Sequence, residues 1–261
     1  MRALQIAATG MSAQQMRVEV ISNNLANMST TGYNPRRAEF ADLQYQQVTR
    51  PGTLTATNGA MVPAGVQLGL GVRPASVAVM LSQGSLTQTN GDLDVAVDGA
   101  GYLEVTLPSG ISAYTRDGSL KRSPEGQVVT SEGYPLVPDI TIPEDARSIS
   151  INANGEVFAY FDDRVEPENL GQITLASFVN EKGLEATGSN LFLETVASGP
   201  PRVATPGQEG LGTIRGGFLE ESAVDPVREI AELIKAQRGY ELNSKVITAA
   251  DQMLGTTVQV R

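Results

Sequence analysis

The sequence predicts an α+β fold in which a helix at each end of the chain flanks a middle part built of β-strands. Three observations support this prediction. Apolar residues recur with a period of seven near both ends, and they alternate with a period of two in the middle. Most of the 27 glycines and 14 prolines lie between Gly32 and Gly217. Glycine and proline at this density suit short strands and turns better than long helices.

The first helix is predicted from a heptad repeat. One set of seam positions is Leu4, Met11, Val18 and Leu25, and the second set, three residues later, is Ala7, Gln14, Ile21 and Met28. Such a repeat is typical of a coiled-coil helix. Turn formers from Asn27 to Gly32 should end it.

The last helix follows the same logic. Its seam positions are Leu233, Tyr240, Ile247 and Leu254, accompanied by Ala236, Asn243 and Ala250. Asp225 can cap the helix, Pro226 fits the first helical position, and Gly255 is expected to stop it. Gly239 should cost about 1 kcal/mol relative to alanine. Neither end should be a stable helix without a partner, and the pattern leaves open whether that partner is the other end or another copy.

The middle of the chain is predicted to be an all-β sandwich or barrel. The candidate strands are Leu93–Val97, Tyr102–Leu107, Ser112–Thr115, Gln127–Thr130, Ser148–Ile151, Glu156–Phe161, Ile173–Phe178 and Leu191–Thr195. Turn signals separate them, and Asn154-Gly155 is the strongest hairpin signal. A spacing near 8–12 residues is typical of sandwiches and barrels.

Two stretches connect these parts. Val48 to Gly71 has little periodicity and is predicted to be a long loop or an extended arm, and Ser198 to Gly217 is a second connector. We therefore expect three domains. They are an inner helical coiled-coil domain (1–30 and 223–261), a connecting domain with the arm (31–92 and 204–222, arm about 46–70), and an outer β domain (93–203).

Composition argues against most chemistry. The chain has no cysteine and no histidine, which excludes a thiol nucleophile, a disulfide framework, a Cys/His zinc site and a Ser-His-Asp triad. Its formal charge of −10 disfavours a nucleic-acid partner. The segment from Gly69 to Pro74 begins like a dinucleotide fingerprint, but Pro74 and a strand-like run replace the third glycine and its helix. We predict no catalytic residue, no cofactor and no metal site, and therefore no enzyme.

Two acidic clusters carry the alternative of a carbohydrate-binding or hydrolytic β-domain. They are Asp92, Asp94 and Asp98, and Asp162, Asp163, Glu166 and Glu168. Neither has the spacing of a calcium loop, and the chain has no tryptophan to form a sugar platform. No transmembrane span or cleavable signal peptide is predicted, so we expect a cytoplasmic protein or one exported without such a signal.

Several separate motifs resemble one family. They are Ala7–Gln15, Val20–Asn27 and Ser29–Tyr33 near the start, Ser82–Leu86, Tyr114–Ser119 and Asn190–Thr195 in the middle, and Gln237–Lys245 and Ala250–Leu254 near the end. In this order they resemble the rod and hook family of the bacterial flagellum, over essentially the whole chain. The chain is too short for the extra outer domain of hook proteins, and its arm resembles that of distal-rod members.

The resemblance implies a structural subunit of a rigid helical tube that transmits torque to the hook and encloses the export channel. Its partners would be further copies of itself, proximal rod proteins, the hook or hook-junction protein, the P- and L-ring proteins, and the export apparatus and rod cap during assembly. No direct membrane insertion is expected. The location would be the basal body, with the rod spanning the periplasm after type III export without a cleaved signal peptide.

The resemblance also assigns residues to assembly. The helical seams would use Leu4, Met11, Val18, Ile21, Asn23, Asn24, Leu25, Asn27, Leu233, Tyr240, Asn243, Ile247 and Leu254, and the arm would make contacts through Arg50, Pro51, Gly52, Pro63 and Gly65. The asparagines could fix register at some cost in stability. The chain departs from the family pattern at Ala223, Pro226 and Gly239. A proximal rod or hook-like component stays open as an alternative within the family.

Overall fold

The computed structural model describes residues 2–49, 64–164 and 166–259. The chain divides into two compact units. The helical unit comprises Met1–Leu25, Arg36–Ala78 and Asp225–Arg261, and the β unit comprises Ala26–Pro35 and Val79–Val224. An α+β fold is therefore confirmed, with long helices at the two ends and strands between them.

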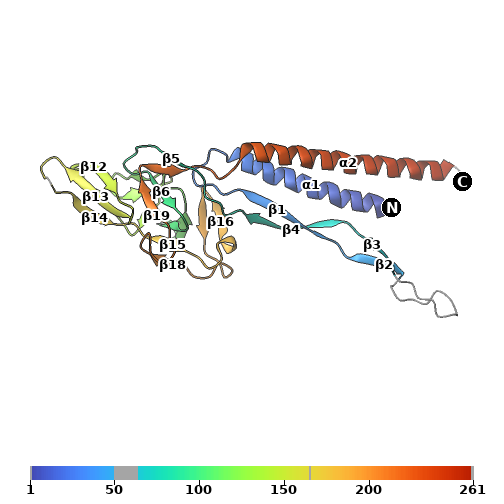
Figure 1. The fold of residues 1–261 in the computed structure, drawn as a ribbon, viewed down its shortest axis with the longest axis horizontal. Helices are drawn as coiled ribbons and strands as arrows, with labels where there is room; N and C mark the ends of the chain where they lie inside the picture. The colour runs from blue at the N-terminus through green and yellow to red at the C-terminus, as the bar shows by residue number, and fades with distance from the viewer. Residues whose placement is uncertain (1, 50–63, 165, 260–261) are drawn as a thin grey trace. The chain divides into compact units, whose positions relative to one another are not determined.

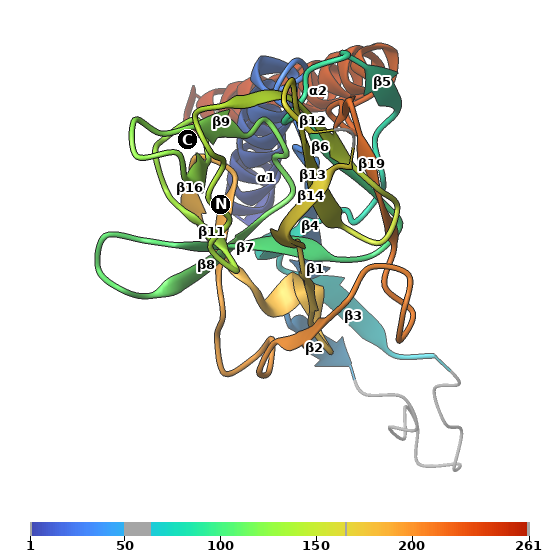
Figure 2. The same ribbon diagram turned by 90° about the vertical axis from the view of Figure 1, so that its left-hand side faces the viewer.

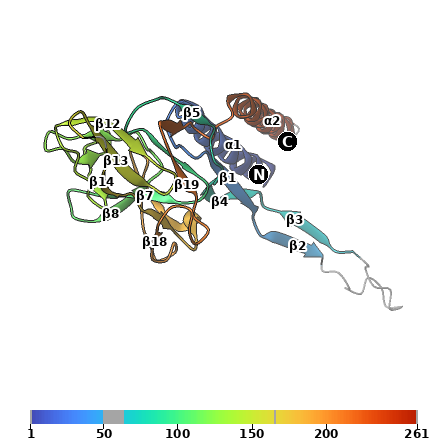
Figure 3. The same ribbon diagram turned by 60° about the vertical axis from the view of Figure 1, so that its left-hand side comes forward.

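Among its described residues, the helical unit contains two helices and a pair of two-stranded ribbons. The helices are α1 (Arg2–Ala26) and α2 (Pro226–Gln259). Strand β1 (Arg36–Asp42) pairs with β4 (Val72–Val79), and β2 (Tyr45–Thr49) pairs with β3 (Val66–Gly69). Figure 1 shows α1 lying between α2 and the β1–β4 ribbon. In Figure 3, β2 and β3 continue the ribbon that β1 and β4 begin.

The start of α2 agrees with the prediction. The Asp225 side chain accepts hydrogen bonds from the backbone N–H groups of Val227 (3.0 Å) and Arg228 (3.2 Å), and the helix begins at Pro226. The predicted stop at Gly255 is wrong, because α2 continues to Gln259. Gly255 does not adopt the left-handed backbone of a glycine that ends a helix. It therefore stays inside the helix as a weak position.

The arm is partly regular. The long loop or arm expected from Val48 to Gly71 begins and ends in strands, because Gln46 pairs with Leu68 and Thr49 pairs with Val66. Gly69 ends β3, and Pro74 lies within β4, so a strand comes after Gly71 as the sequence indicated. Pro74 is compatible with β4 because this strand belongs to a ribbon of only two strands.

The described part of the β unit contains sixteen strands and one short 3₁₀ helix. They are β5 (Leu86–Gln88), β6 (Val95–Asp98), β7 (Tyr102–Thr106), β8 (Ser112–Thr115), β9 (Lys121–Arg122), β10 (Val128–Val129), β11 (Leu136–Val137), β12 (Ala146–Ile151), β13 (Glu156–Phe161), β14 (Glu168–Gln172), β15 (Leu175–Ser177), η1 (Glu181–Gly183), β16 (Glu185–Gly188), β17 (Leu191–Leu193), β18 (Arg202–Ala204), β19 (Thr213–Gly216) and β20 (Phe218–Glu220). All eight strand candidates of the middle region overlap a strand of the structure.

The largest sheet has seven strands in the order β16-β17-β8-β7-β15-β18, with β11 also paired to β7. Figure 2 shows β7 and β8 as one long hairpin within this sheet. A three-stranded sheet β12-β13-β14 and the two-stranded pairs β19–β6, β20–β5 and β10–β9 complete the unit. This grouping confirms a β body but not a sandwich or a barrel.

The hairpin predicted at Asn154-Gly155 is confirmed, because β12 and β13 pair antiparallel across it. The Asn152 side chain organises the turn by accepting hydrogen bonds from the backbone N–H groups of Asn154 (3.0 Å) and Glu156 (2.9 Å). Gly155 has a φ of +83°. A Cβ atom there would lie 2.6 Å from the Ile173 carbonyl oxygen, so only glycine fits.

The core of the β unit is apolar and contiguous. Its fully buried members include Val95, Leu103, Val105, Leu175 and Ile214, from four strands. A second cluster is aromatic, with Tyr102, Tyr114 and Phe178 in edge-to-face contact. Strand β19 alternates buried Ile214 with exposed neighbours, whereas β6, β7 and β15 bury consecutive residues and are therefore covered on both faces.

Candidate functional site

The predicted seam residues differ widely in exposure. Ile21 and Asn24 are buried; Leu4, Met11, Val18, Leu25, Asn27, Leu233, Asn243 and Ile247 are half-buried; and Asn23, Tyr240 and Leu254 are exposed. The two helices run antiparallel within the helical unit, since Gly10 lies against Asn243 and Gln14 lies against Gly239. Arg17 also forms an ion pair with Glu232. Part of each seam is therefore covered by the other helix of the same chain.

Asn24 is 1% exposed and binds within its own chain. Its side-chain amide donates a hydrogen bond to the Arg36 carbonyl oxygen (2.8 Å) and accepts one from the Arg36 N–H (2.9 Å). The same amide donates to Glu229 on α2 (3.3 Å). Asn24 thus joins α1, the start of β1 and α2. This intrachain role was not foreseen in the sequence, where Asn24 was assigned to assembly with neighbours.

A large part of α2 exposes apolar side chains. Tyr240 (45%) and Leu254 (40%) are exposed on the same side as Ala236. Six further exposed residues are Val227 (79%), Ile230 (47%), Ile234 (53%), Leu242 (62%), Val246 (48%) and Met253 (63%). At 100° per residue they fall together on the side of α2 away from Ala236 and Ile247. Lys235 on this helix donates a hydrogen bond to Glu232, which, with Arg17 nearby, lowers the pKa of that carboxyl. We call these six residues the outer face of α2.

The arm also exposes apolar residues. On the β2–β3 ribbon, Leu68 is 44% exposed and Val66 is 51% exposed, and they share one face because they are two residues apart. Val48 (59%) lies next to the irregular pairing between Gln47 and Thr49. Of the predicted arm contacts, Arg50, Pro51, Gly52 and Pro63 lie outside the described residues. Gly65 lies just before β3 and is half-buried.

A buried polar hub in the β unit was not predicted from the sequence. Arg116 and Glu220 form an ion pair of 3.0 Å, with side-chain exposures of only 9% and 3%. Arg116 also donates hydrogen bonds to the carbonyl oxygens of Gly99 (2.8 Å) and Val97 (3.4 Å). Its guanidinium lies 5.8 Å from the centre of the Tyr102 ring. The buried guanidinium of Arg116 therefore has a carboxylate, two carbonyl oxygens and an aromatic ring as partners.

The motifs that suggested the family meet at this hub. The other oxygen of the Glu220 carboxylate accepts a hydrogen bond from the Gly84 N–H (3.0 Å), and the Glu220 carbonyl accepts one from the Gly32 N–H (2.8 Å). Gln83 bridges Val97 and Gly99 through its amide. Arg116, Gly84 and Gly32 each come from a different motif. One indication of this hub was present in the sequence, where Arg116 stands alone between an apolar strand and the Asp117-Gly118 turn.

Two glycines of these motifs leave no room for a side chain. A Cβ atom at Gly84 would lie 1.9 Å from the Glu221 carbonyl oxygen, and one at Gly118 would lie 1.6 Å from the Val95 carbonyl oxygen. Next to Gly118, burial raises the pKa of the Asp117 carboxyl, against a hydrogen bond from the Ser119 N–H that lowers it. These motif positions therefore serve the packing of the β unit.

The hub also joins two distant parts of the chain. Besides the bond from Gly32 to Glu220, the Ala223 N–H donates to the Tyr33 carbonyl oxygen (3.0 Å), and the Asn190 side chain donates to the Thr31 carbonyl oxygen (2.7 Å). The segment after α1 and the segment before α2 are thus hydrogen-bonded to each other. Ala223, a departure from the family pattern, uses its backbone here, so its side chain is not required for this contact.

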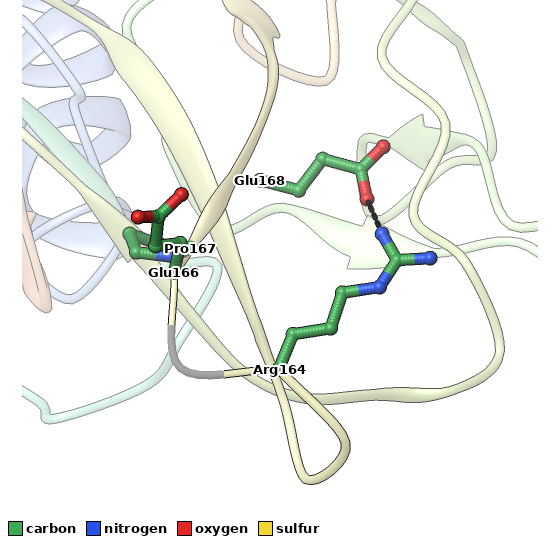
Figure 4. Close-up of a pocket in the computed structure, with 4 residues that line it drawn as sticks. All are labelled: Arg164, Glu166, Pro167 and Glu168. Atoms are coloured by element: carbon green, nitrogen blue, oxygen red, sulfur yellow. Dashed lines mark hydrogen bonds and ion pairs between the residues drawn. The ribbon is translucent and has the colours of Figure 1, made fainter.

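The acidic cluster of Asp162, Asp163, Glu166 and Glu168 is exposed and forms ion pairs at the surface. Arg164 and Glu168 line an open hollow of about 450 Å³ and form an ion pair, with side-chain exposures of 68% and 51%. Figure 4 shows these two side chains facing each other and Glu166 turned away. Asp162 pairs with Arg147 in the same way. Within the described ranges, no group of three or more acidic side chains could hold a metal ion.

The environment of the aromatic cluster raises the pKa of two tyrosines. Burial, with help from Glu104 and Glu194, raises the pKa of Tyr114 to about 12. Burial and the Glu181 carboxylate raise the pKa of Tyr102 still further, and the Tyr102 hydroxyl donates to Glu181 (3.1 Å). Both phenols therefore stay protonated near neutral pH, and both rings pack in the aromatic cluster.

No helix among the described residues combines the length and the apolar character needed to cross a membrane.

Comparison with known proteins assigns the chain to a family. Residues 4–34 match the family described as "Flagella basal body rod protein", residues 96–159 match "Flagellar hook protein FlgE/F/G D1 domain", and residues 215–260 match "Flagellar basal body rod FlgEFG protein C-terminal". The chain is similar to the "Flagellar basal-body rod protein FlgG" of Caulobacter vibrioides, with 51% identity over 100% of both chains.

The proteins of the same name from Borreliella burgdorferi and Bacillus subtilis are 47% and 36% identical to it. The first alignment covers 98% of this chain and 97% of the relative, and the second covers 100% and 99%. The helices, the Arg116–Glu220 hub and the C-terminal segment all lie within or beside the matched regions. The chain belongs to the flagellar basal-body rod protein family.

Proposed function

We propose that this protein is a structural subunit of the distal rod of the bacterial flagellum. In this role it assembles with further copies into a rigid helical tube that transmits torque to the hook and encloses the export channel. The observation that carries the proposal is the outer face of α2. Six large apolar residues lie exposed there, and their burial between subunits would drive assembly.

The free energy available for assembly can be estimated from the apolar side chains that this face would bury. A fully buried valine, isoleucine, leucine or methionine side chain contributes about 1.5–3 kcal/mol relative to an exposed one. Several such side chains per subunit give an interface of useful strength, even after the cost of ordering the helix. The apolar face of the β2–β3 ribbon, with Val66 and Leu68, would add a second contact and brace neighbouring subunits.

Charge supports the same division of roles. The helical unit has 11 basic and 8 acidic residues, whereas the β unit has 8 basic and 21 acidic residues. Copies of the β unit repel one another at low ionic strength, and the nearly neutral helical unit does not. The helices would then form the inner coiled-coil layer, the arm the connecting domain, and the β body the outer domain.

The proposed partners are consistent with this position. They are proximal rod proteins at one end, the hook or hook-junction protein at the other, the P- and L-ring proteins around the rod, and the export apparatus and rod cap during assembly. We infer export by the flagellar type III route and a location in the periplasmic part of the basal body. Helices that complete their folding only on assembly would suit passage through a narrow channel.

The test is a pair of matched substitutions in the full chain. Val246→Asp places a charge on the outer face of α2, and Val196→Asp makes the same change at a fully exposed residue of the β unit. Each variant is expressed in a flagellated strain that lacks its own distal rod protein. Swimming is scored, and isolated basal bodies are viewed by electron microscopy.

We expect Val246→Asp to abolish the distal rod and Val196→Asp to retain it, because only the first change places a charge in an apolar interface between subunits. Limited proteolysis of each purified variant shows whether its β unit is folded. Rods of normal length with Val246→Asp, in a strain that swims, would rule out assembly through this face. Loss of rods with both variants, each with a folded β unit, would contradict the proposed division between helices and β body.

A further inference from the structure

The most buried apolar residues of α1 and α2 are mostly small. Ala7 and Ala13 of α1 and Ala236 and Ala250 of α2 are at most 7% exposed. Ile21, at 5%, is the one large apolar residue of the described helices that is equally buried. Small buried methyl groups specify the relative position of two helices only weakly, because uniform packing is nearly unchanged after a shift of one turn. Something else must fix how far one helix lies along the other.

Two reciprocal contacts stand out in the middle of this seam. A Cβ atom at Gly10 would lie 2.9 Å from Nδ2 and 3.1 Å from Oδ1 of Asn243. A Cβ atom at Gly239 would lie 3.1 Å from Cδ and 3.3 Å from Cγ of Gln14. Each helix therefore places a carboxamide group directly over a glycine of the other.

The spacing makes the arrangement symmetric. Gly10 precedes Gln14 by four residues, and Gly239 precedes Asn243 by four residues, so glycine and amide lie one turn apart on one face of each helix. In the antiparallel pair, each glycine meets the other helix's amide. A shift of one turn, about 6 Å, would place amide against amide in one direction, with Gly10 opposite Ile247. In the other direction it would place glycine against glycine, with Gln14 opposite Lys235.

We propose that these four residues form a reciprocal clasp that sets the register of α1 against α2 within one subunit. The proposal does not depend on the role of the protein in the rod. It gives a reason for Gly239, a glycine in the interior of a helix, because the missing Cβ leaves room for the Gln14 side chain. The register in turn decides where along the helix pair the outer face of α2 is presented.

The first test uses the absence of native cysteine. Cysteine is placed in pairs at the four clasp positions of the full chain, in two matching and two shifted combinations. Gly10→Cys with Asn243→Cys and Gln14→Cys with Gly239→Cys are in register. Gly10→Cys with Gly239→Cys and Gln14→Cys with Asn243→Cys use the same substitutions one turn out of register. Mild oxidation is followed by non-reducing electrophoresis of the purified chain and of isolated basal bodies.

We expect the two in-register pairs to form a disulfide within one chain, at least tenfold faster than the shifted pairs, because a disulfide needs Cα atoms within about 7 Å. Equal rates for all four pairs, bonds only between chains, or no bond in either preparation would overturn the proposal.

The second test replaces helical glycines by alanine and measures the stability of the helices. The proposal predicts that alanine destabilises the helices at the clasp, although alanine normally stabilises a helix. Alanine in place of an unconstrained helical glycine stabilises the helix about fivefold in its folding equilibrium. Gly255→Ala should show this gain, because no other atom lies within 4 Å of its Cβ position. Gly10→Ala and Gly239→Ala should lower the melting midpoint of the helical circular dichroism signal instead.

Shortening the facing amide should restore the gain. In the double variants Gly10→Ala with Asn243→Ala, and Gly239→Ala with Gln14→Ala, the added methyl group no longer meets a carboxamide. Each double variant should melt above the corresponding amide variant alone. If Gly10→Ala and Gly239→Ala stabilise the helices as much as Gly255→Ala does, the carboxamides do not constrain the glycines and the proposal is wrong.

Discussion

Replacing Arg116 by methionine should strongly destabilise the β unit. The change removes the positive charge and leaves the Glu220 carboxylate 3% exposed without its ion-pair partner. It also removes the donors to the carbonyl oxygens of Gly99 and Val97. Methionine has a similar length and fills most of the same space, so the effect reports the polar contacts rather than a cavity.

The magnitude depends on burial. Breaking a buried ion pair by removing one partner costs about 3–5 kcal/mol, because the remaining charge is poorly solvated. Glu220→Gln should cost less, about 2–3 kcal/mol, since a glutamine oxygen can still accept the Gly84 hydrogen bond. The double variant leaves no unpaired charge, so its cost should fall short of the sum of the single costs by at least about 2 kcal/mol.

The assay is urea unfolding of the full chain, monitored by the near-ultraviolet circular dichroism of its tyrosines. The chain has no tryptophan, and Tyr102 and Tyr114 lie buried beside the hub. Arg164→Met is the matched control, because Arg164 forms an ion pair with Glu168 that is largely exposed to solvent. Exposed pairs contribute about 0–1 kcal/mol, so this control should unfold almost as the native chain does.

Two results would refute the reasoning about the hub. The first is a cost below about 1 kcal/mol for Arg116→Met with an unchanged urea dependence, which would mean that Glu220 finds other partners or water. The second is a double variant whose cost equals the sum of the two single costs, which would mean that the two charges act independently.

Two further predictions concern single side chains. Asn24→Leu should cost about 1–3 kcal/mol in helix stability, because it leaves the Arg36 N–H and carbonyl without their partner. Melting of the helices, followed by circular dichroism, measures this cost. The control Ser22→Leu, at an exposed position of the same helix, should change the melting midpoint little. Stability should also fall between pH 10 and about 12, since an unfolded tyrosine loses its proton near pH 10 while Tyr114 keeps it to about 12. Tyr114→Phe should reduce this fall by about 1.4 kcal/mol per pH unit, and an unchanged slope in urea titrations would contradict it.

The sequence determined the parts of this protein that depend on local pattern. The heptads predicted α1 and α2, and Asp225-Pro226 marked the start of α2 correctly, because caps and periodicity act over a few residues. The hairpin at Asn154-Gly155 was likewise predictable from its turn residues. Gly255 was misjudged because a glycine ends a helix only where its backbone adopts the left-handed conformation, and at Gly255 the backbone stays helical.

The motifs were also sufficient for the family, since they recur in order along the whole chain, and relatives with 36–51% identity confirm it. Their physical role was not visible in the sequence. Gly32, Gly84 and Arg116 are separated by 32 residues or more, and only the folded chain brings them to Glu220. A buried ion pair gives no periodic signal, because it depends on one charge meeting another across the fold.

The pairing of the arm and of the other strands was also decided only by the tertiary structure. The sequence indicated strands, but it could not say that β16, β17, β8, β7, β15 and β18 would join in this order, because strand pairing depends on contacts far apart in the chain. Asn24 shows the distinction in one residue. Its place on a predicted helix was evident from the sequence. Its hydrogen bonds to Arg36 were not, because they form only when the start of β1 lies next to α1. Local sequence therefore determined which helices, hairpins and caps form, and the tertiary structure decided which buried polar groups meet, because only folding brings distant donors and acceptors together.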